Sequence, residues 1–332
     1  MPSFNTRPLH IIAAILLLGG LAACSTERYA EPIKGFSDAA ARATDAVRDM
    51  NQSLADATLS YAMQAATDPN RGKLDLTKGD TCGAFVPVDN AEEAVRCRAE
   101  FVITAEGGTP VTIDRQAYTN PMGNMVAVMA AIQKYAANLA EVQSDNTKEK
   151  VNASLTQIQG NLVELAKAAN PNAQVPAGLP EAAGQGVRWL FGQYIESVKF
   201  DALRKATKAA AQPLDDAALA FQGFAEEAKN LISVTAMDAS AKAIRQRPDN
   251  TAATNRDALD KANAYDDLLT APLSSMVDDL VDAHKRLEAA LNGTGEVSIE
   301  EIFSRLEEIK GQAEEIATIA KNISAALKPK TT

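Results

Sequence analysis

The chain is poor in the side chains on which most enzyme sites depend. It has two histidines, three cysteines and one tryptophan, and aromatic residues make up only 5% of its length. Because His10 lies within a predicted signal sequence, His284 is the one histidine of the remaining chain. That count excludes His-rich metal sites, His-ligated di-iron bundles and bis-His haem.

Signature motifs of catalysis are also missing from the sequence. G-x-S-x-G, H-E-x-x-H, Walker A and S-x-x-K patterns do not occur after the signal sequence, and Gly184-Gln185-Gly186 lacks the third glycine of a dinucleotide-binding loop. We therefore expect a protein that is not an enzyme and that binds no cofactor.

The sequence has fewer basic than acidic residues. The formal net charge is -10, and removal of residues 1–23, which contain Arg7 as their one charged side chain, makes it -11. Nucleic-acid binding depends on neutralising phosphates, so an acidic chain is a poor partner for DNA or RNA. The simplest interpretation is a well-solvated protein surface.

The N-terminus carries the most informative pattern. Arg7 precedes an uncharged apolar run at 11–18, and Gly19-Gly20 lead into Leu21-Ala22-Ala23-Cys24. This order is typical of a signal peptide, and the run is shorter than the roughly 20 residues that span a bilayer. Together, the residues resemble the lipobox of bacterial lipoproteins, which are substrates of signal peptidase II. The alternative is a plain secretory signal with an incidental cysteine.

The resemblance to a lipobox implies both a cellular location and a lipid anchor. Residues 1–23 would be removed, and Cys24 would become the first residue, carrying diacylglyceryl and an amide-linked acyl chain such as palmitate. Ser25, in place of an aspartate, implies the outer membrane, with the protein facing the periplasm. Acyl chains hold a protein at a membrane surface without a spanning helix, at about 0.8 kcal/mol per buried methylene.

Two further cysteines, Cys82 and Cys97, remain for an oxidising compartment, and such a pair predicts a disulfide bond. In the chain-entropy model, a loop of this size stabilises the fold by about 3 kcal/mol. A redox or metal-binding pair is the alternative, but the spacing is not C-x-x-C and no histidines cluster nearby.

Apolar residues recur at helical spacing along most of the chain, alternating between three and four residues. The last such stripe consists of Ile302, Leu306, Ile309, Ala313, Ile316, Ala320, Ile323 and Leu327, after a capping box at Ser298 and Glu301. The first consists of Phe36, Ala40, Ala43, Val47, Met50, Leu54, Ala57 and Tyr61. The pattern predicts an all-α fold, an elongated antiparallel bundle of long heptad-patterned helices. Self-association through the heptad seams is the alternative to burial within one chain.

Helix boundaries follow from breakers and from the stripes. One long helix is favoured over 122–169, with a turn near 144–147 as the alternative. We expect a loop over 170–180, a helix over 181–211, and a new helix that begins at Pro213. A further helix over 253–291 has Leu269, Leu273 and Met276 on its seam and a kink at Pro272.

The pattern breaks over residues 68–121. Runs at 101–104 and 111–113 flank Gly107-Gly108 and predict a short β-hairpin. We expect a small insertion, stapled by Cys82–Cys97, that caps the bundle or carries recognition. The predicted organisation is therefore a signal peptide over 1–23, a tether over 24–35, a bundle over 36–327 and a disordered tail over 328–332.

Few polar groups suggest a site. Asp278 and Asp282 share a helix face and are weak candidates for binding a divalent cation. His284 is expected on the flank of its helix, paired with Glu288, and Trp189 and Phe191 are expected in the core rather than in a ligand pocket.

The functional hypothesis is a lipid-anchored, non-enzymatic envelope protein that binds another envelope component or acts as a spacer. Alternatives are a small-molecule receptor or enzyme with a carboxylate-based site and, by analogy alone, a helical pore-forming protein.

Overall fold

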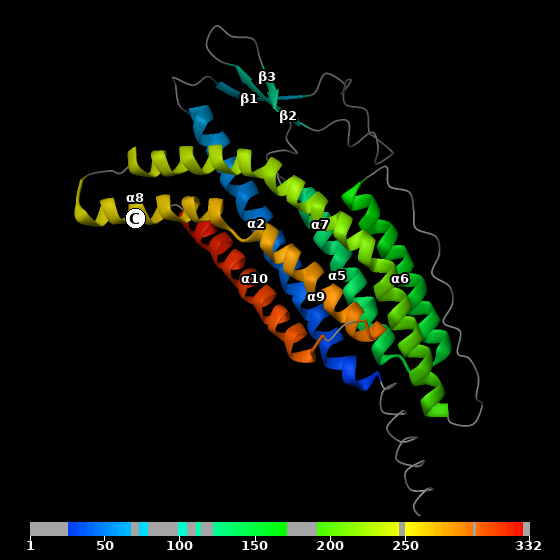
Figure 1. Ribbon diagram of the computed structural model, residues 1–332. Coiled ribbons are helices and arrows are strands. Elements are labelled where there is room, and N and C mark those ends of the chain that lie inside the picture. Colours follow the sequence, from blue (N-terminus) through cyan, green and yellow to red (C-terminus); the bar gives the residue numbers. More distant parts are fainter. Residues whose placement is uncertain are drawn as a thin grey trace, which may run out of the picture. The chain divides into compact units, whose positions relative to one another are not determined.

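A computed structural model describes residues 26–67, 73–78, 99–104, 111–113, 122–170, 191–245, 250–294 and 297–327 (Figure 1). This part contains seven α-helices, one 3₁₀ helix and a three-stranded sheet. The helices are α2 (Glu27–Thr67), α5 (Gly123–Ser144), α6 (Lys148–Ala169), α7 (Phe191–Arg245), α8 (Ala252–Asp266), α9 (Leu273–Asn292) and α10 (Ile299–Leu327), with η1 (Asp267–Thr270) after α8. The predicted helical bundle is confirmed. None of the described helices is both long and apolar enough to cross a membrane.

The chain divides into two compact units. Unit 1 comprises Met1–Thr44, Ala127–Gly223 and Leu273–Ala313, and unit 2 comprises Asp45–Val126, Phe224–Pro272 and Glu314–Thr332. Four helices, α2, α5, α7 and α10, contribute residues to both units.

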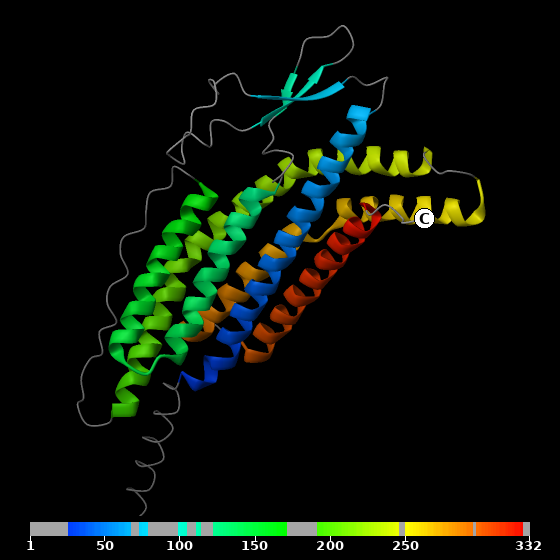
Figure 2. The same cartoon turned by 180° about the vertical axis from the view of Figure 1, so that it is seen from behind.

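Unit 1 is a bundle of helical segments that run side by side in both views (Figure 1, Figure 2). The start of α2, the end of α5, the end of α9 and the start of α10 meet at one end of it. Its core is built from the predicted stripes, in which small and large side chains alternate. The fully or almost fully buried members include Phe36, Ala40, Ala43, Met129, Ile132, Ala136, Leu139, Val151, Ile158, Leu165, Leu280, Leu287, Ile302, Leu306 and Ile309.

Small residues let the helices of unit 1 approach closely. A β-carbon added at Gly35 of α2 would lie 2.8 Å from Leu306 Cδ1 of α10. The hydroxyl of Thr44 donates to the carbonyl of Ala40 in its own helix at 2.8 Å and contacts that of Met129 in α5 at 3.0 Å. The buried hydroxyl of Thr44 is thereby matched to partners in both helices.

Unit 2 joins the ends of helices to a small sheet. Strands β1 (Lys73–Lys78), β2 (Ala99–Thr104) and β3 (Val111–Ile113) are antiparallel in the order β1-β2-β3, and Val102 pairs with Thr112. The side chain of Asn51 accepts a hydrogen bond from the backbone N–H of Met122, just before α5, at 2.9 Å. Cys82 and Cys97 lie outside the described residues.

Three predicted helix boundaries are wrong. Residues 122–169 form two helices rather than one, because Thr147 caps α6 by accepting a hydrogen bond from the backbone N–H of Lys150 at 3.3 Å. No new helix begins at Pro213, which lies inside α7. Pro272 does not kink a continuous helix either; it lies between η1 and α9 and immediately precedes the first residue of α9.

Two further predictions need correction. The tether predicted over 24–35 is wrong for most of its length, because α2 begins at Glu27. Leu269 was expected on a buried seam, but it lies in η1 and is 42% exposed, since the chain leaves the helical path there.

Candidate functional site

The chain begins its described course in a buried position, two residues after Cys24. Thr26 is completely buried in unit 1. Its backbone N–H donates to Glu196 Oε2 of α7 at 3.3 Å, and its hydroxyl donates to the same oxygen. The side-chain amide of Gln143, from the last turn of α5, donates to the carbonyl oxygen of Thr26 at 3.2 Å. Two helices therefore hold the residue that precedes α2.

A partly buried charge pair supports this contact. Lys199 Nζ lies 3.2 Å from Glu196 Oε1, so the two carboxylate oxygens have separate partners. Burial by itself would raise the pKa of Glu196, but hydrogen bonds from Thr26 and Lys199 and the charge of Lys199 outweigh it and lower that pKa. Glu196 is thus held as the carboxylate, which is the form that accepts both bonds from Thr26.

Tyr29 extends the contact to a third helix. Its hydroxyl donates to the carbonyl oxygen of Ala290 near the end of α9 at 3.0 Å. Its ring lies 6.1 Å from that of Phe200 of α7, and the Arg28 guanidinium lies 5.9 Å from its centroid. We call Thr26, Tyr29, Gln143, Glu196 and Lys199 the N-terminal clamp. It ties the start of α2 to α5, α7 and α9.

A second polar feature is enclosed in the core of unit 1. His284 of α9 is completely buried, and its Nε2 lies 2.8 Å from the hydroxyl of Tyr135 of α5. The rings of Phe36 and Tyr135 lie 5.9 and 5.6 Å from the imidazole. The expected pairing of His284 with Glu288 is therefore wrong, because the imidazole points into the bundle and its hydrogen-bond partner lies on a different helix.

Burial sets the protonation of this pair. It lowers the pKa of His284 to about 3, with smaller opposing effects from the charges of Asp215 and Lys285. Burial, followed by the charge of Glu288, raises the pKa of Tyr135 above its ordinary value. His284 Nδ1 is buried and has no partner among the described residues. A neutral imidazole shut off from solvent has a packing role and no access to a substrate.

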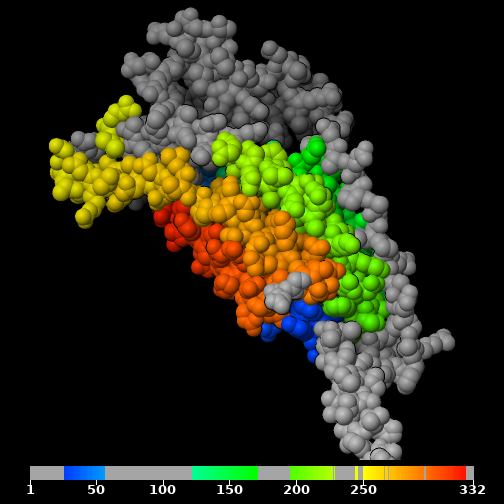
Figure 3. Space-filling view, in the orientation of Figure 1, coloured from blue at the N-terminus to red at the C-terminus, as the bar shows by residue number. Residues whose placement is uncertain are grey.

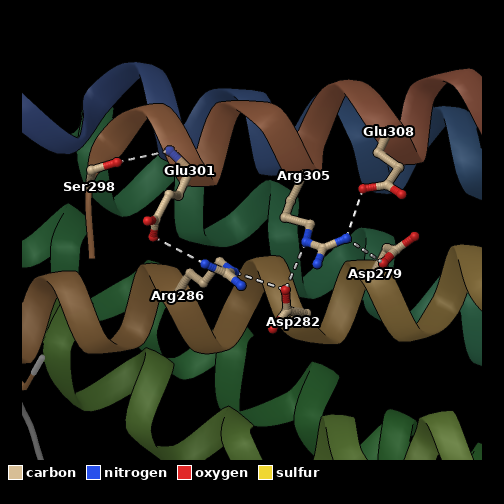
Figure 4. Close-up of polar contacts among 7 residues, drawn as sticks. All are labelled: Asp279, Asp282, Arg286, Ser298, Glu301, Arg305 and Glu308. Carbon is tan, nitrogen blue, oxygen red and sulfur yellow. Dashed lines mark hydrogen bonds and ion pairs between the residues drawn. The ribbon is translucent and has the colours of Figure 1, made fainter. Parts of the chain in front are cut away.

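Asp278 and Asp282, the predicted cation-binding carboxylates, both lie on α9, and Asp282 belongs to an ion-pair cluster with α10 (Figure 4). Arg286 and Arg305 both contact Asp282, at 2.8 and 3.0 Å. Arg305 also reaches Asp279 of α9 and Glu308 of its own helix, at 3.3 and 2.7 Å. The cluster joins two helices that lie next to each other on one surface of unit 1 (Figure 3).

The partners of these carboxylates do not favour a metal. Asp282 has two arginines, and Asp278 accepts a hydrogen bond from Gln222 of α7 at 2.7 Å. Within the described ranges, no three His, Cys, Asp or Glu side chains are grouped so that they could hold a metal ion. Ser298 caps α10 as predicted, by accepting from the N–H of Glu301 at 3.1 Å, but the carboxylate of Glu301 pairs with Arg286.

Unit 2 contains a cleft of about 410 Å³ between α8, η1 and the end of α10. Its polar lining consists of Asp257, Asp260, Lys261, Asn263, Asp267 and Asn322. Lys261 pairs with Asp257 at 3.3 Å, so this lysine already balances part of the acidic charge of the cleft.

The remaining predicted site residues, Cys24, Cys82, Cys97 and Trp189, lie outside the described residues. Phe191 is the first residue of α7.

No protein-family model, curated protein or solved structure matches the chain.

Proposed function

We propose that this chain is a lipid-anchored, non-enzymatic protein of the bacterial cell envelope, held at the outer membrane through acyl groups on Cys24 and facing the periplasm. It binds another envelope component or acts as a spacer between components. The observation that carries the proposal is the N-terminal clamp, in which Thr26 is fixed to α5 and α7 only two residues after the lipobox cysteine. Because the clamp lies so close to Cys24, an acyl anchor on that residue would attach the bundle directly to the membrane.

The contacts that the polar side chains make with neighbouring helices support a role without catalysis. The histidine of the mature chain is buried against Tyr135, and Arg286 and Arg305 tie α9 to α10. Each of these groups stabilises contacts between helices. Catalytic acids, bases and nucleophiles need access to a cleft, together with a partner that tunes them.

The finer architecture is part of the same proposal. We infer an elongated antiparallel bundle with an insertion over 68–121, stapled by Cys82–Cys97 and containing a hairpin. The antiparallel register of β2 and β3, in which Phe101 pairs with Ile113, supports the hairpin. An insertion of this kind on a rigid helical scaffold is the natural place for partner recognition.

The cleft of unit 2 favours a second candidate function, a receptor for a small polar molecule with a carboxylate-based site. Three aspartates and two asparagines line it, so the ligand would present a cationic group and hydrogen-bond donors. Loss of binding of a candidate ligand in an Asp260→Asn variant, measured by calorimetry, would support this function over the first.

Fractionation of cells that produce the chain tests the lipid anchor. We expect the protein to sediment with membranes and to incorporate labelled palmitate, and we expect Cys24→Ser to abolish both. The matched control is the double variant Cys82→Ser, Cys97→Ser, which also replaces cysteine with serine but should leave sedimentation unchanged. Membrane sedimentation of Cys24→Ser would refute the proposal.

A further inference from the structure

The distance between the proposed anchor and the folded bundle is very short. Only Ser25 separates Cys24 from Thr26, and two extended residues reach at most about 7 Å. The polar headgroup layer of a bilayer is itself about 5–8 Å thick on each side. If the acyl chains of Cys24 lie in the hydrocarbon, the start of α2 therefore cannot rise beyond the headgroups.

The clamp prevents the chain from lengthening this tether. To release more residues, the first turn of α2 would have to unwind. Unwinding would break the bonds of Thr26 with Glu196 and Gln143 and then that of Tyr29 with Ala290. It would also leave the carboxylate of Glu196 half-buried with fewer partners, which is costly for a charged group.

Charge does not draw this end of the bundle to the membrane. The first turns of α2 and α6 and the turn between α5 and α6 carry as many acidic as basic side chains, namely Glu27, Arg28, Asp145, Lys148, Glu149 and Lys150. Proteins attracted by anionic lipids present clusters of four to eight basic residues. Contact with the membrane must therefore come from the tether, and it should be insensitive to salt.

From these observations, we infer that the end of unit 1 that carries the N-terminal clamp is a membrane-facing surface, pressed against the lipid headgroups by a two-residue tether. The inference rests on the proposed acylation of Cys24. It defines the partner of this surface as the headgroup layer of the leaflet in which the acyl chains are embedded. The opposite end of unit 1 is then the part directed toward other envelope components.

Fluorescence quenching by lipids measures this contact. The acylated mature protein is reconstituted into phosphatidylcholine vesicles that contain phosphatidylcholine with a spin label on its headgroup. A fluorophore is attached to Lys150→Cys, in the first turn of α6, or to Lys167→Cys, in its last turn. Both positions are exposed, and they lie about 25 Å apart along one helix. Parent protein treated with the same reagent gives the background from the native cysteines.

We expect quenching at position 150 to exceed quenching at position 167 several-fold, and to persist in 0.5 M salt. Insertion of twenty Gly and Ser residues between Ser25 and Thr26 gives a flexible tether of about 25 Å, which should reduce quenching at position 150 to the level at 167. Equal quenching at both positions in vesicle-bound protein with the native tether would overturn the inference. Failure of the native protein to bind vesicles would instead overturn the proposed lipid anchor.

Discussion

Acid should destabilise unit 1 through the buried imidazole of His284. Burial lowers the pKa of His284 to about 3, whereas an exposed histidine titrates near 6.5. The unfolded chain therefore takes up a proton between these pH values, and the folded chain does not. The contribution of His284 to stability is complete above about pH 6.5 and is lost progressively as the pH falls toward 3.

The size of the effect follows from the difference in pKa. Each unit corresponds to about 1.4 kcal/mol, so the free energy of unfolding should fall by about 3 kcal/mol between pH 6.5 and pH 4 from this residue alone. The groups that face the imidazole do not offset this loss, because the charges of Asp215 and Lys285 act on it in opposite directions. Tyr135 stays protonated throughout, since burial raises its pKa.

Urea unfolding at pH 7, 6, 5 and 4 measures the effect in a chain that starts at residue 24 and carries Cys24→Ser. The control is the double variant Tyr135→Phe, His284→Phe, which removes both hydrogen-bonding partners and keeps the packing against Phe36. Carboxylates titrate in both proteins, so the difference between the two curves isolates His284. We expect that difference to shift by about 3 kcal/mol in favour of the double variant between pH 6.5 and pH 4.

Magnetic resonance gives a direct check on the same residue. A chain that starts at residue 24 lacks His10 and has His284 as its single histidine, so its imidazole signal needs no assignment. The signal should not titrate above pH 4. Titration near pH 6.5 in the folded protein, or parallel stability curves for the two chains, would refute the reasoning from burial.

Two further variants test how the helices are held. Arg305→Ala should lower the urea midpoint, because Asp279, Asp282 and Glu308 lose the cation that they share; the loss should shrink in 1 M salt, and a loss unchanged by salt would contradict an ionic origin. Pro213→Ala should raise the free energy of unfolding by about 1–2 kcal/mol, because it restores a helical hydrogen bond and outweighs the lost ring contacts; lower stability by the same urea assay would contradict this.

The spacing of apolar residues predicted the core well, because burial of one helix face is a local property of the sequence. The stripe of the last helix is buried from Ile302 to Ile323, and that of the first from Phe36 to Leu54. Each stripe repeats every three or four residues, so its members share a face whatever their neighbours in space are.

The phase of a stripe also indicates where helices end. At two of the wrongly predicted boundaries, the phase indicated the observed structure better than the presence or absence of proline and glycine did. Across Pro213 the buried positions continue in step, from Ala210 to Leu214 and Ala217, so burial on both sides offsets the missing hydrogen bond and α7 continues. Between Leu139 and Val151 the phase shifts, and the helix breaks there although no glycine or proline is present.

Pro272 ends a helical path where Pro213 does not, and the difference lies in the flanking residues. Residues 266, 267, 269 and 270 are exposed, so the described side chains of the turn before this proline provide no buried apolar face that would hold it in an α-helix. Proline is also favoured at the start of a helix, and α9 begins directly after it.

The N-terminal clamp could not be found from the sequence. Thr26 and Glu196 are 170 residues apart, and neither lies in a local pattern that sets it apart from surface residues. The same holds for Tyr135 and His284, which are 149 residues apart. Hydrogen bonds between helices depend on how the helices are arranged, and periodicity carries no information about that arrangement.

Replacing glycine with alanine should change the free energy of unfolding in opposite directions at two positions, because another helix approaches closely at only one of them. Gly35→Ala places a methyl group 2.8 Å from Leu306 Cδ1, and Leu306 is completely buried. Overpacking costs about 1–3 kcal/mol, whereas helix propensity returns about 1 kcal/mol, so the variant should lose about 1 kcal/mol. Gly160→Ala, in α6, meets no atom within 4 Å and should gain about 0.5–1 kcal/mol.

Urea unfolding of both alanine variants, alone and with Leu306→Val, separates the two contributions. Valine withdraws the end of the side chain from Gly35, so Gly35→Ala should be less destabilising in that background, while Gly160→Ala should have the same effect in both. A gain in stability from Gly35→Ala in the native background would mean that Leu306 can move aside. The seam between α2 and α10 would then be less tightly packed than its buried residues indicate.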